Sequence, residues 1–205
     1  LGSVTGIESR NELVQNTKDL ARELKFDRMS FINSEIADSK KLILKNVDMV
    51  TALHACDTAT DDAIRFGLDV KAKYMFLVPC CQAEISRHLR TNKAESLKKP
   101  LAELWRHGIH TVEMGSHLTN VLRCLLLESQ GYKVTVTELV GWEHSMKNEL
   151  IIAEYIGTKK GNANERINNI LEEFNLQSLK PRFNFNEKIE LDYEIFFCNN
   201  IYKLT

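Results

Sequence analysis

The sequence predicts an α/β protein whose sheet is doubly wound and mostly parallel, with an antiparallel hairpin toward its C-terminal side. Short apolar runs alternate with amphipathic helical patterns along most of the chain. Runs such as Met49–Leu53 and Met75–Val78 are largely apolar rather than alternating. Continuous apolar runs are typical of parallel strands that are covered on both faces. The order of elements therefore favours a sheet with helices on both faces.

The elements of the N-terminal half follow from local patterning. Strands are predicted at residues 4–9, 29–33, 49–53 and 74–78. Apolar residues at helical spacing predict helices at residues 13–24, with Asn11 as the N-cap, and at residues 59–70. The candidate caps of the second helix are Asp57, Thr58 and Thr60.

The C-terminal half begins with helices and closes with strands. Helices are predicted within residues 83–100, 101–130 and 165–174, a hairpin at 132–140 and 149–156, and a strand or extended tail at 188–197. Gly131 stands where a glycine commonly ends a helix. The composition turns polar at Gly157. We therefore expect one domain over residues 1–157 and a C-terminal helix with an extended tail over residues 158–205.

The composition is that of an ordinary soluble globular protein. Of the 205 residues 43% are hydrophobic and 27% charged, and the formal net charge is −1, so no global attraction to nucleic acid or anionic lipid is expected. Five cysteines without a framework spacing favour a reducing compartment. The sequence contains neither a membrane-spanning run nor a signal peptide pattern at its start, which predicts a cytoplasmic location.

Reactive side chains follow two of the predicted apolar strands. His54, Cys56 and Asp57 come after the first of them, and Cys80 and Cys81 follow the next. In open α/β sheets ligands bind outside the carboxyl ends of the strands. The sequence therefore predicts an active-site rim that carries a histidine, an aspartate and three thiols.

The paired cysteines allow several interpretations. Small polarizable side chains can line a pocket, a thiolate can act as a nucleophile, and Cys80 and Cys81 with Cys56 and His54 can form a zinc ligand set. Zinc sites usually space their cysteines by two or more residues, so we predict pocket lining and no metal. Buried inert thiols are the structural alternative.

Four segments together carry a resemblance to a known family. They are Leu53–Ile64 (LHACDTATDDAI), Pro79–Cys81 (PCC), Arg106–Ile109 (RHGI) and Glu143–Asn148 (EHSMKN). In combination they resemble bacterial class I S-adenosylmethionine-dependent methyltransferases, and the pieces HxCxxATD and CC are also similar to the eukaryotic tRNA acceptor-stem ribose 2′-O-methyltransferases. The resemblance covers about residues 4–156 and implies a Rossmann-like sheet, an S-adenosylmethionine cofactor and an RNA acceptor, foremost tRNA.

The resemblance assigns roles to particular residues. It implies that Glu8 binds the ribose hydroxyls of the cofactor, that Glu35 and Ile36 contact the adenine, and that His54 borders the methyl-donor pocket. It places His54, Asp57, Cys80 and Cys81 around the methyl acceptor, with His54 or Asp57 as the base. The structural alternatives are a solvated turn acid for Glu8, an exposed loop acid for Glu35, a buried histidine for His54 and a helix cap for Asp57.

The sequence departs from the family pattern at two places. The first strand of the family and its glycine-rich loop have no match, so we expect them upstream of Leu1. Without that central strand, two unpaired strand edges would face each other. Gln82 stands where the bacterial relatives usually have histidine.

Two rival functions remain open from the sequence alone. The chain is expected to be an enzyme, but a non-catalytic RNA-binding or scaffold protein that retained the fold is the alternative. A nucleotide-dependent redox protein that uses the cysteine pair is a third reading. The sequence does not indicate an oligomeric state.

Overall fold

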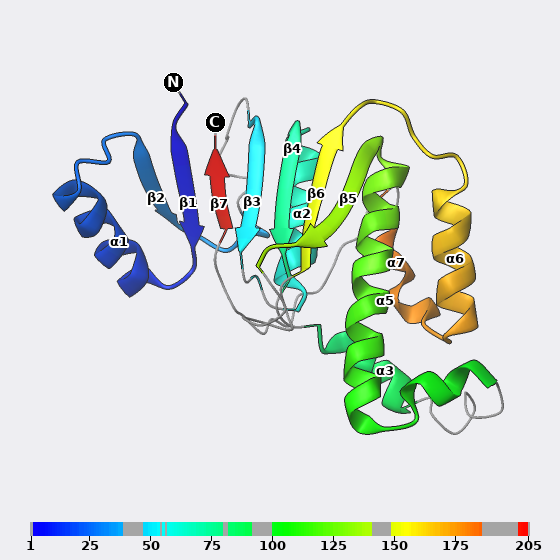
Figure 1. Ribbon diagram of the computed structural model, residues 1–205. Coiled ribbons are helices and arrows are strands. Elements are labelled where there is room, and N and C mark those ends of the chain that lie inside the picture. Colours follow the sequence, from blue (N-terminus) through cyan, green and yellow to red (C-terminus); the bar gives the residue numbers. More distant parts are fainter. Residues whose placement is uncertain are drawn as a thin grey trace. The chain divides into compact units, whose positions relative to one another are not determined.

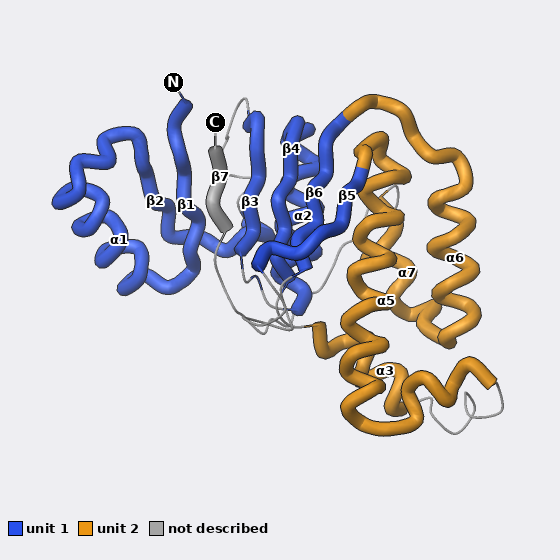
Figure 2. Tube along the Cα trace, in the orientation of Figure 1, with its two compact units in different colours: residues 1–80, 134–155, 197–205 blue, residues 81–133, 156–196 orange. Residues whose placement is uncertain are grey.

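The computed structural model describes residues 2–38, 47–53, 55, 57–79, 82–91, 100–140, 149–185 and 201–204. The chain forms two compact units, which Figure 2 shows in different colours. Unit 1 contains residues 1–80, 134–155 and 197–205, and unit 2 contains residues 81–133 and 156–196.

The strands form one sheet in the order β2-β1-β7-β3-β4-β6-β5 (Figure 1). Their bounds are β1 Val4–Glu8, β2 Met29–Asn33, β3 Met49–Leu53, β4 Tyr74–Val78, β5 Tyr132–Glu138, β6 Glu149–Tyr155 and β7 Ile201–Leu204. The first six agree closely with the strands that the patterning predicts. The expected strand at residues 188–197 lies outside the described residues.

The described sheet is mixed. β1 pairs with β2 in parallel, and β3 pairs with β4 in parallel. β6 runs antiparallel to β4, and β7 runs antiparallel to both β1 and β3. The expectation of a mostly parallel sheet is therefore not confirmed. The two edges that were expected to face each other unpaired are joined by β7, which satisfies their main-chain hydrogen bonds.

The core of unit 1 lies on the central strands. Side chains of β3, β4 and β6 are fully buried; they are Val50, Ala52, Met75, Leu77, Ile151 and Ala153. Residues that are only partly buried alternate with them, such as Thr51, Phe76 and Ile152, so one face of these strands is buried more completely than the other.

Two helices of unit 1 follow strands β1 and β3. α1 (Asn11–Glu23) packs on β1 and β2, and α2 (Ala59–Asp69) packs on β3 and β4. Val14 and Ala21 of α1 form a buried cluster with Phe31 of β2. Arg10, rather than the expected Asn11, is the N-cap residue of α1, and Asn11 is its first helical residue.

Unit 2 is built around the long helix α5. Its helices are α3 (Glu84–Thr91), a 3₁₀ helix (Pro100–Trp105), α5 (Gly108–Ser129), α6 (Ala163–Glu173), a 3₁₀ helix (Gln177–Leu179) and α7 (Lys180–Phe183). α5 packs against α3, α6 and α7. An ion pair of 3.0 Å between Arg182 and Glu84 joins α7 to α3. None of the helices that the structure describes has the length and apolar character to cross a bilayer.

The predicted helix over residues 101–130 is divided. A 3₁₀ helix ends at Trp105, and α5 begins at Gly108 after His107, whose backbone is extended. An extended residue cannot continue a helix, so the chain changes direction there. The other end agrees with the prediction, because Gly131 has a φ of 93° and its N–H donates to the main-chain oxygen of Glu128.

Candidate functional site

The carboxyl ends of β1, β2, β3 and β4 lie along one edge of the sheet. The last residues of β1 and β2 align with each other, as do the last residues of β3 and β4. β7 aligns with both pairs, since Ile201 lies opposite Ile7 on one side and Ala52 on the other. We call this the carboxyl edge. The residues that follow these four strands therefore leave the sheet at the same edge.

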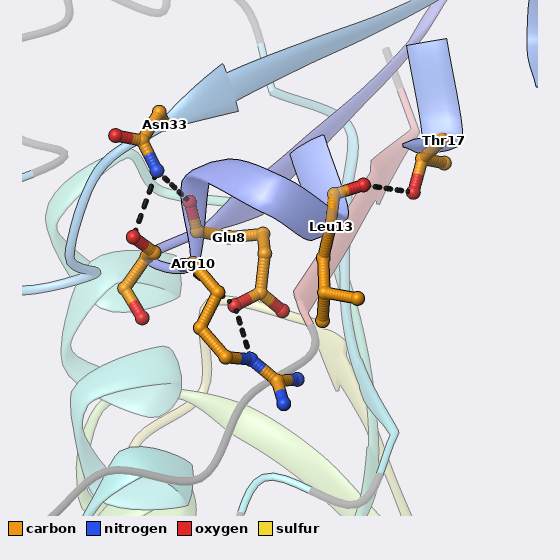
Figure 3. A network of polar contacts seen from close by, with 6 residues as sticks. Glu8, Arg10, Leu13, Thr17 and Asn33 are labelled. Carbon is orange, nitrogen blue, oxygen red and sulfur yellow. Dashed lines mark hydrogen bonds and ion pairs between the residues drawn. The ribbon is translucent and has the colours of Figure 1, made fainter. Parts of the chain in front are cut away.

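Glu8, the last residue of β1, lies at the carboxyl edge in a network of polar contacts (Figure 3). Its Oε1 accepts hydrogen bonds from the main-chain N–H of Arg10 at 2.9 Å and from the Arg10 Nε at 3.1 Å. The side chain is only 11% exposed, and its Oε2 is buried with no hydrogen-bond partner among the described residues. A buried acceptor without a donor costs about 1–3 kcal/mol, so this oxygen is suited to a ligand hydroxyl.

The main chain at Glu8 is fixed by the end of β2. The Asn33 Nδ2 donates to the main-chain oxygens of Glu8, at 3.1 Å, and Ser9, at 2.8 Å (Figure 3). The N–H of Ser34 donates to the same Glu8 oxygen at 3.1 Å. The Glu8 carboxylate thus projects from a backbone that a neighbouring strand holds in place. No pattern in the sequence indicates this role of Asn33.

Glu35 and Ile36 follow directly after β2. Both are half-buried, and the N–H of Asp38 donates to the Glu35 main-chain oxygen at 3.2 Å, which closes a turn. The bond from Ser34 to Glu8 brings the start of this turn to the end of β1. The structure therefore places three of the predicted cofactor-binding residues at the ends of two adjacent strands, Glu8 as the last residue of β1 and Glu35 and Ile36 shortly after β2. Their contacts with a cofactor remain a prediction.

Asp57 lies between β3 and α2 in a conformation that is unusual for a residue with a side chain. Its φ is 49°, in the left-handed region, where Asp and Asn are more frequent than other non-glycine residues. Thr58 is the N-cap of α2 but makes no capping bond through its side chain. Strained positions often occur at functional sites, so the geometry is compatible with the predicted role of Asp57.

The segment that carries Asp57 is held by Thr60. The Thr60 Oγ1 donates to the main-chain oxygen of Ala55 at 2.6 Å, and both residues are completely buried. This bond ties the first turn of α2 back to the chain that leaves β3. His54 and Cys56, which flank Ala55, lie outside the described residues, so their predicted roles stay predictions.

Gln82 lies in the segment between β4 and α3. In the sequence it is notable only as a departure from a family pattern. Pro79 is buried, Cys80 and Cys81 lie outside the described residues, and Gln82 is 6% exposed. The Gln82 side chain accepts a hydrogen bond from Ser116 and donates one to Asn120, both on α5. The sequence signal for this contact is a pair of polar residues, Ser116 and Asn120, four positions apart on a largely apolar helix. The sequence analysis did not identify it.

The structure bears on metal binding only in part. Among the residues that it describes, no three His, Cys, Asp or Glu side chains are placed to hold a metal ion. All four residues of the zinc ligand set weighed from the sequence, and the predicted turn at Glu143–Asn148, fall outside those residues. The prediction of no metal therefore remains a prediction.

One resolved shift of pKa lies away from the carboxyl edge. Hydrogen bonding and electrostatic interaction with Tyr74 raise the pKa of Lys73. The Lys73 ammonium lies 5.0 Å from the centre of the Tyr74 ring. Because Tyr74 begins β4, this pair belongs to the opposite end of the strand and has no part in the candidate site.

The part of the chain that matches a known family is the part that forms the carboxyl edge. Residues 1–88 match the family model of a methyltransferase domain. None of the curated proteins matches the chain. The matched region contains β1 to β4 and therefore every strand end of the carboxyl edge. The match, which spans less than half of the chain, supports a methyltransferase relationship for this part of the protein.

Proposed function

We propose that this protein is an S-adenosylmethionine-dependent methyltransferase whose acceptor is RNA, foremost tRNA. The family match supports the methyltransferase part of the proposal. The cofactor and the acceptor rest on the sequence resemblance together with the geometry of the carboxyl edge.

The observation that carries the proposal is the buried Oε2 of Glu8. It has no hydrogen-bond partner among the described residues, while Oε1 is held by Arg10. A carboxylate at the end of a strand can accept hydrogen bonds from the hydroxyls of a ribose. Since Arg10 fixes one oxygen, the other has a defined direction, and the residue fits the ribose of S-adenosylmethionine.

Further residues would hold the cofactor and the acceptor. Glu35 offers an acceptor for the exocyclic amine of adenine, and the half-buried Ile36 offers an apolar surface for the ring. When bound, S-adenosylmethionine supplies an electrophilic methyl group on its sulfonium. Asp57 or His54 would take the proton from a hydroxyl acceptor, and Cys80 and Cys81 would line the acceptor pocket.

The proposal of an RNA acceptor is supported by a group of basic residues that follow the cysteine pair. Arg87, His88 and Arg90 lie on α3, within a longer basic segment of the sequence that ends at Lys99. Arginine side chains on a helix suit the phosphates of a nucleic acid backbone. We therefore expect RNA binding to weaken steeply as the salt concentration rises.

Calorimetry of the full-length protein with S-adenosylhomocysteine tests the proposal. The wild-type protein is expected to bind, and Glu8→Ala is expected to weaken binding several-fold because the ribose loses its acceptor. His54→Ala is expected to weaken it less. Glu12→Ala is the matched control, since it removes an exposed carboxylate four residues away without touching the site. Equal affinity in the wild type and Glu8→Ala would remove Glu8 from the site.

A non-catalytic RNA-binding or scaffold protein is the second candidate, and one observation favours it. The strand between β1 and β3 is the antiparallel β7, so its carboxyl end points away from the carboxyl edge. A glycine-rich loop that followed this strand would therefore leave the sheet at the edge opposite Glu8. Binding of tRNA without binding of S-adenosylhomocysteine would support this candidate.

A further inference from the structure

We propose that Gln82 is a positioning residue, which fastens the chain directly after Cys80 and Cys81 to α5 through a buried polar network. Its consequence for catalysis rests on the proposed function, whereas the fastening itself does not. The network consists of Gln82, Ser116, Asn120 and Arg123, all in unit 2.

Both ends of the Gln82 side-chain amide are engaged. Its Oε1 accepts a hydrogen bond from the Ser116 Oγ at 2.5 Å, and its Nε2 donates to the Asn120 Oδ1 at 3.3 Å. Ser116 and Asn120 are four residues apart and so lie on the same face of α5. The Ser86 Oγ also lies 3.4 Å from the Gln82 main-chain oxygen. Gln82 is therefore held to one helix by its side chain and to another by its main chain.

The charge of Arg123 determines which way the amides point. Arg123 is completely buried, and its guanidinium donates to the Asn120 Oδ1 at 3.2 Å. That oxygen accordingly accepts from both Arg123 and Gln82. A reversed Gln82 amide would place its oxygen against the Asn120 oxygen and its NH₂ against the Ser116 hydroxyl. The network thus has one favourable orientation, which gives Gln82 a single conformation.

This arrangement does not suit Gln82 to act as a base. A carboxamide is neither protonated nor deprotonated near neutral pH, and here both of its polar ends face α5. Gln82 directly follows Cys81 in the sequence, so the residue at which the chain leaves the cysteine pair is held by α5. Any role of residue 82 in methyl transfer is therefore that of a positioning residue and not that of a base.

Hydrogen exchange of the full-length protein, followed by mass spectrometry of a peptide that begins near Pro79, tests the inference. Gln82→Met keeps the size of the side chain but removes its hydrogen bonds, and Ser116→Ala removes one donor. Both are expected to speed exchange at residues 87–91 about fivefold or more, because the N–H groups of these residues are bonded within α3 and α3 opens more often. Asn120→Leu should act similarly, whereas Asn120→Asp should restore slow exchange since it keeps an acceptor for Gln82 and Arg123.

Thr119→Val is the matched control. Thr119 is also buried on α5, but its hydroxyl donates to the Gly115 main-chain oxygen at 2.7 Å and not to Gln82. Thr119→Val should lower the melting temperature as much as Ser116→Ala without speeding exchange at residues 87–91. Equal exchange rates at residues 87–91 in Ser116→Ala and Thr119→Val would overturn the inference even if Gln82→Met failed to fold. Slow exchange in a folded Gln82→Met variant would overturn it as well.

The test separates this inference from the proposed function. A wild-type protein that does not bind S-adenosylhomocysteine would defeat the proposed function but would leave the exchange pattern unchanged. Conversely, a protein that binds S-adenosylhomocysteine with unaltered exchange in Ser116→Ala would keep the proposed function and remove the positioning role of Gln82.

Discussion

The Asn33 Nδ2 lies 3.1 Å from the main-chain oxygen of Glu8, and this hydrogen bond joins the last residues of two adjacent parallel strands. The same nitrogen donates to Ser9 at 2.8 Å. Because both acceptors are main-chain atoms, Asn33 holds the backbone that carries Glu8 without using its carboxylate. The direction of the candidate ribose acceptor therefore depends on a residue from the neighbouring strand.

Replacing Asn33 is expected to affect both stability and cofactor binding. Asn33→Ala removes two exposed hydrogen bonds and should lower the free energy of unfolding by about 0.5–1.5 kcal/mol. Asn33→Asp should be worse, because an ionised carboxylate only accepts and would face two carbonyl oxygens. Urea unfolding measures the first effect, and calorimetry with S-adenosylhomocysteine the second. The control is Arg22→Ala, which breaks an exposed ion pair on α1. An Asn33→Asp variant as stable as the wild type would contradict this account.

Substitutions at Asp57 can separate its backbone role from its carboxylate. At a φ of 49° glycine and asparagine are tolerated, whereas alanine should cost about 1–2 kcal/mol. Asp57→Gly and Asp57→Asn should therefore remain near wild-type stability in thermal unfolding, and Asp57→Ala should not. If the carboxylate is the base, all three variants should lose methyl transfer to tRNA, measured with radiolabelled S-adenosylmethionine. Activity retained in Asp57→Asn would exclude that role.

Two glycines of α5 should respond to alanine in opposite ways. A Cβ at Gly115 would meet main-chain atoms of Ser86 on α3, the nitrogen at 2.7 Å and the Cα at 2.9 Å, whereas a Cβ at Gly108 would meet nothing within 4 Å. Gly115→Ala should push α3 away and lower the free energy of unfolding by about 1–3 kcal/mol, less the gain in helix propensity. Gly108→Ala should be neutral or stabilising by up to about 1 kcal/mol. Urea unfolding of both variants decides the point, and a stabilised Gly115→Ala would show that the helices separate freely.

The local elements were predictable because their signals are local. The strands at Val4–Glu8 and Tyr74–Val78 follow from short apolar runs, and Gly131 ends α5 as a glycine at that position should. The break before Gly108 was not predictable, since residues 101–130 have continuous helical character. It depends on the extended backbone of His107, which no residue type requires.

The candidate site was predictable only as a set of strand ends. That Glu8 ends one strand, and that His54 and Asp57 follow another, can be read from the sequence. The supporting bonds could not be, because they join residues that are far apart in the chain. Asn33 is 25 residues from Glu8, and Ser116 is 34 residues from Gln82.

By itself, the sequence determined the α/β class, six strands of the sheet and the chemical types of side chain at their ends, because apolar periodicity and turn residues act over short distances. The tertiary structure alone decided that β7 lies between β1 and β3, that Oε2 of Glu8 is buried without a donor among the described residues, and that Gln82 is held by α5. These features depend on strand order, on burial and on hydrogen bonds between distant segments. They arise only when the chain has folded and its remote parts are in contact.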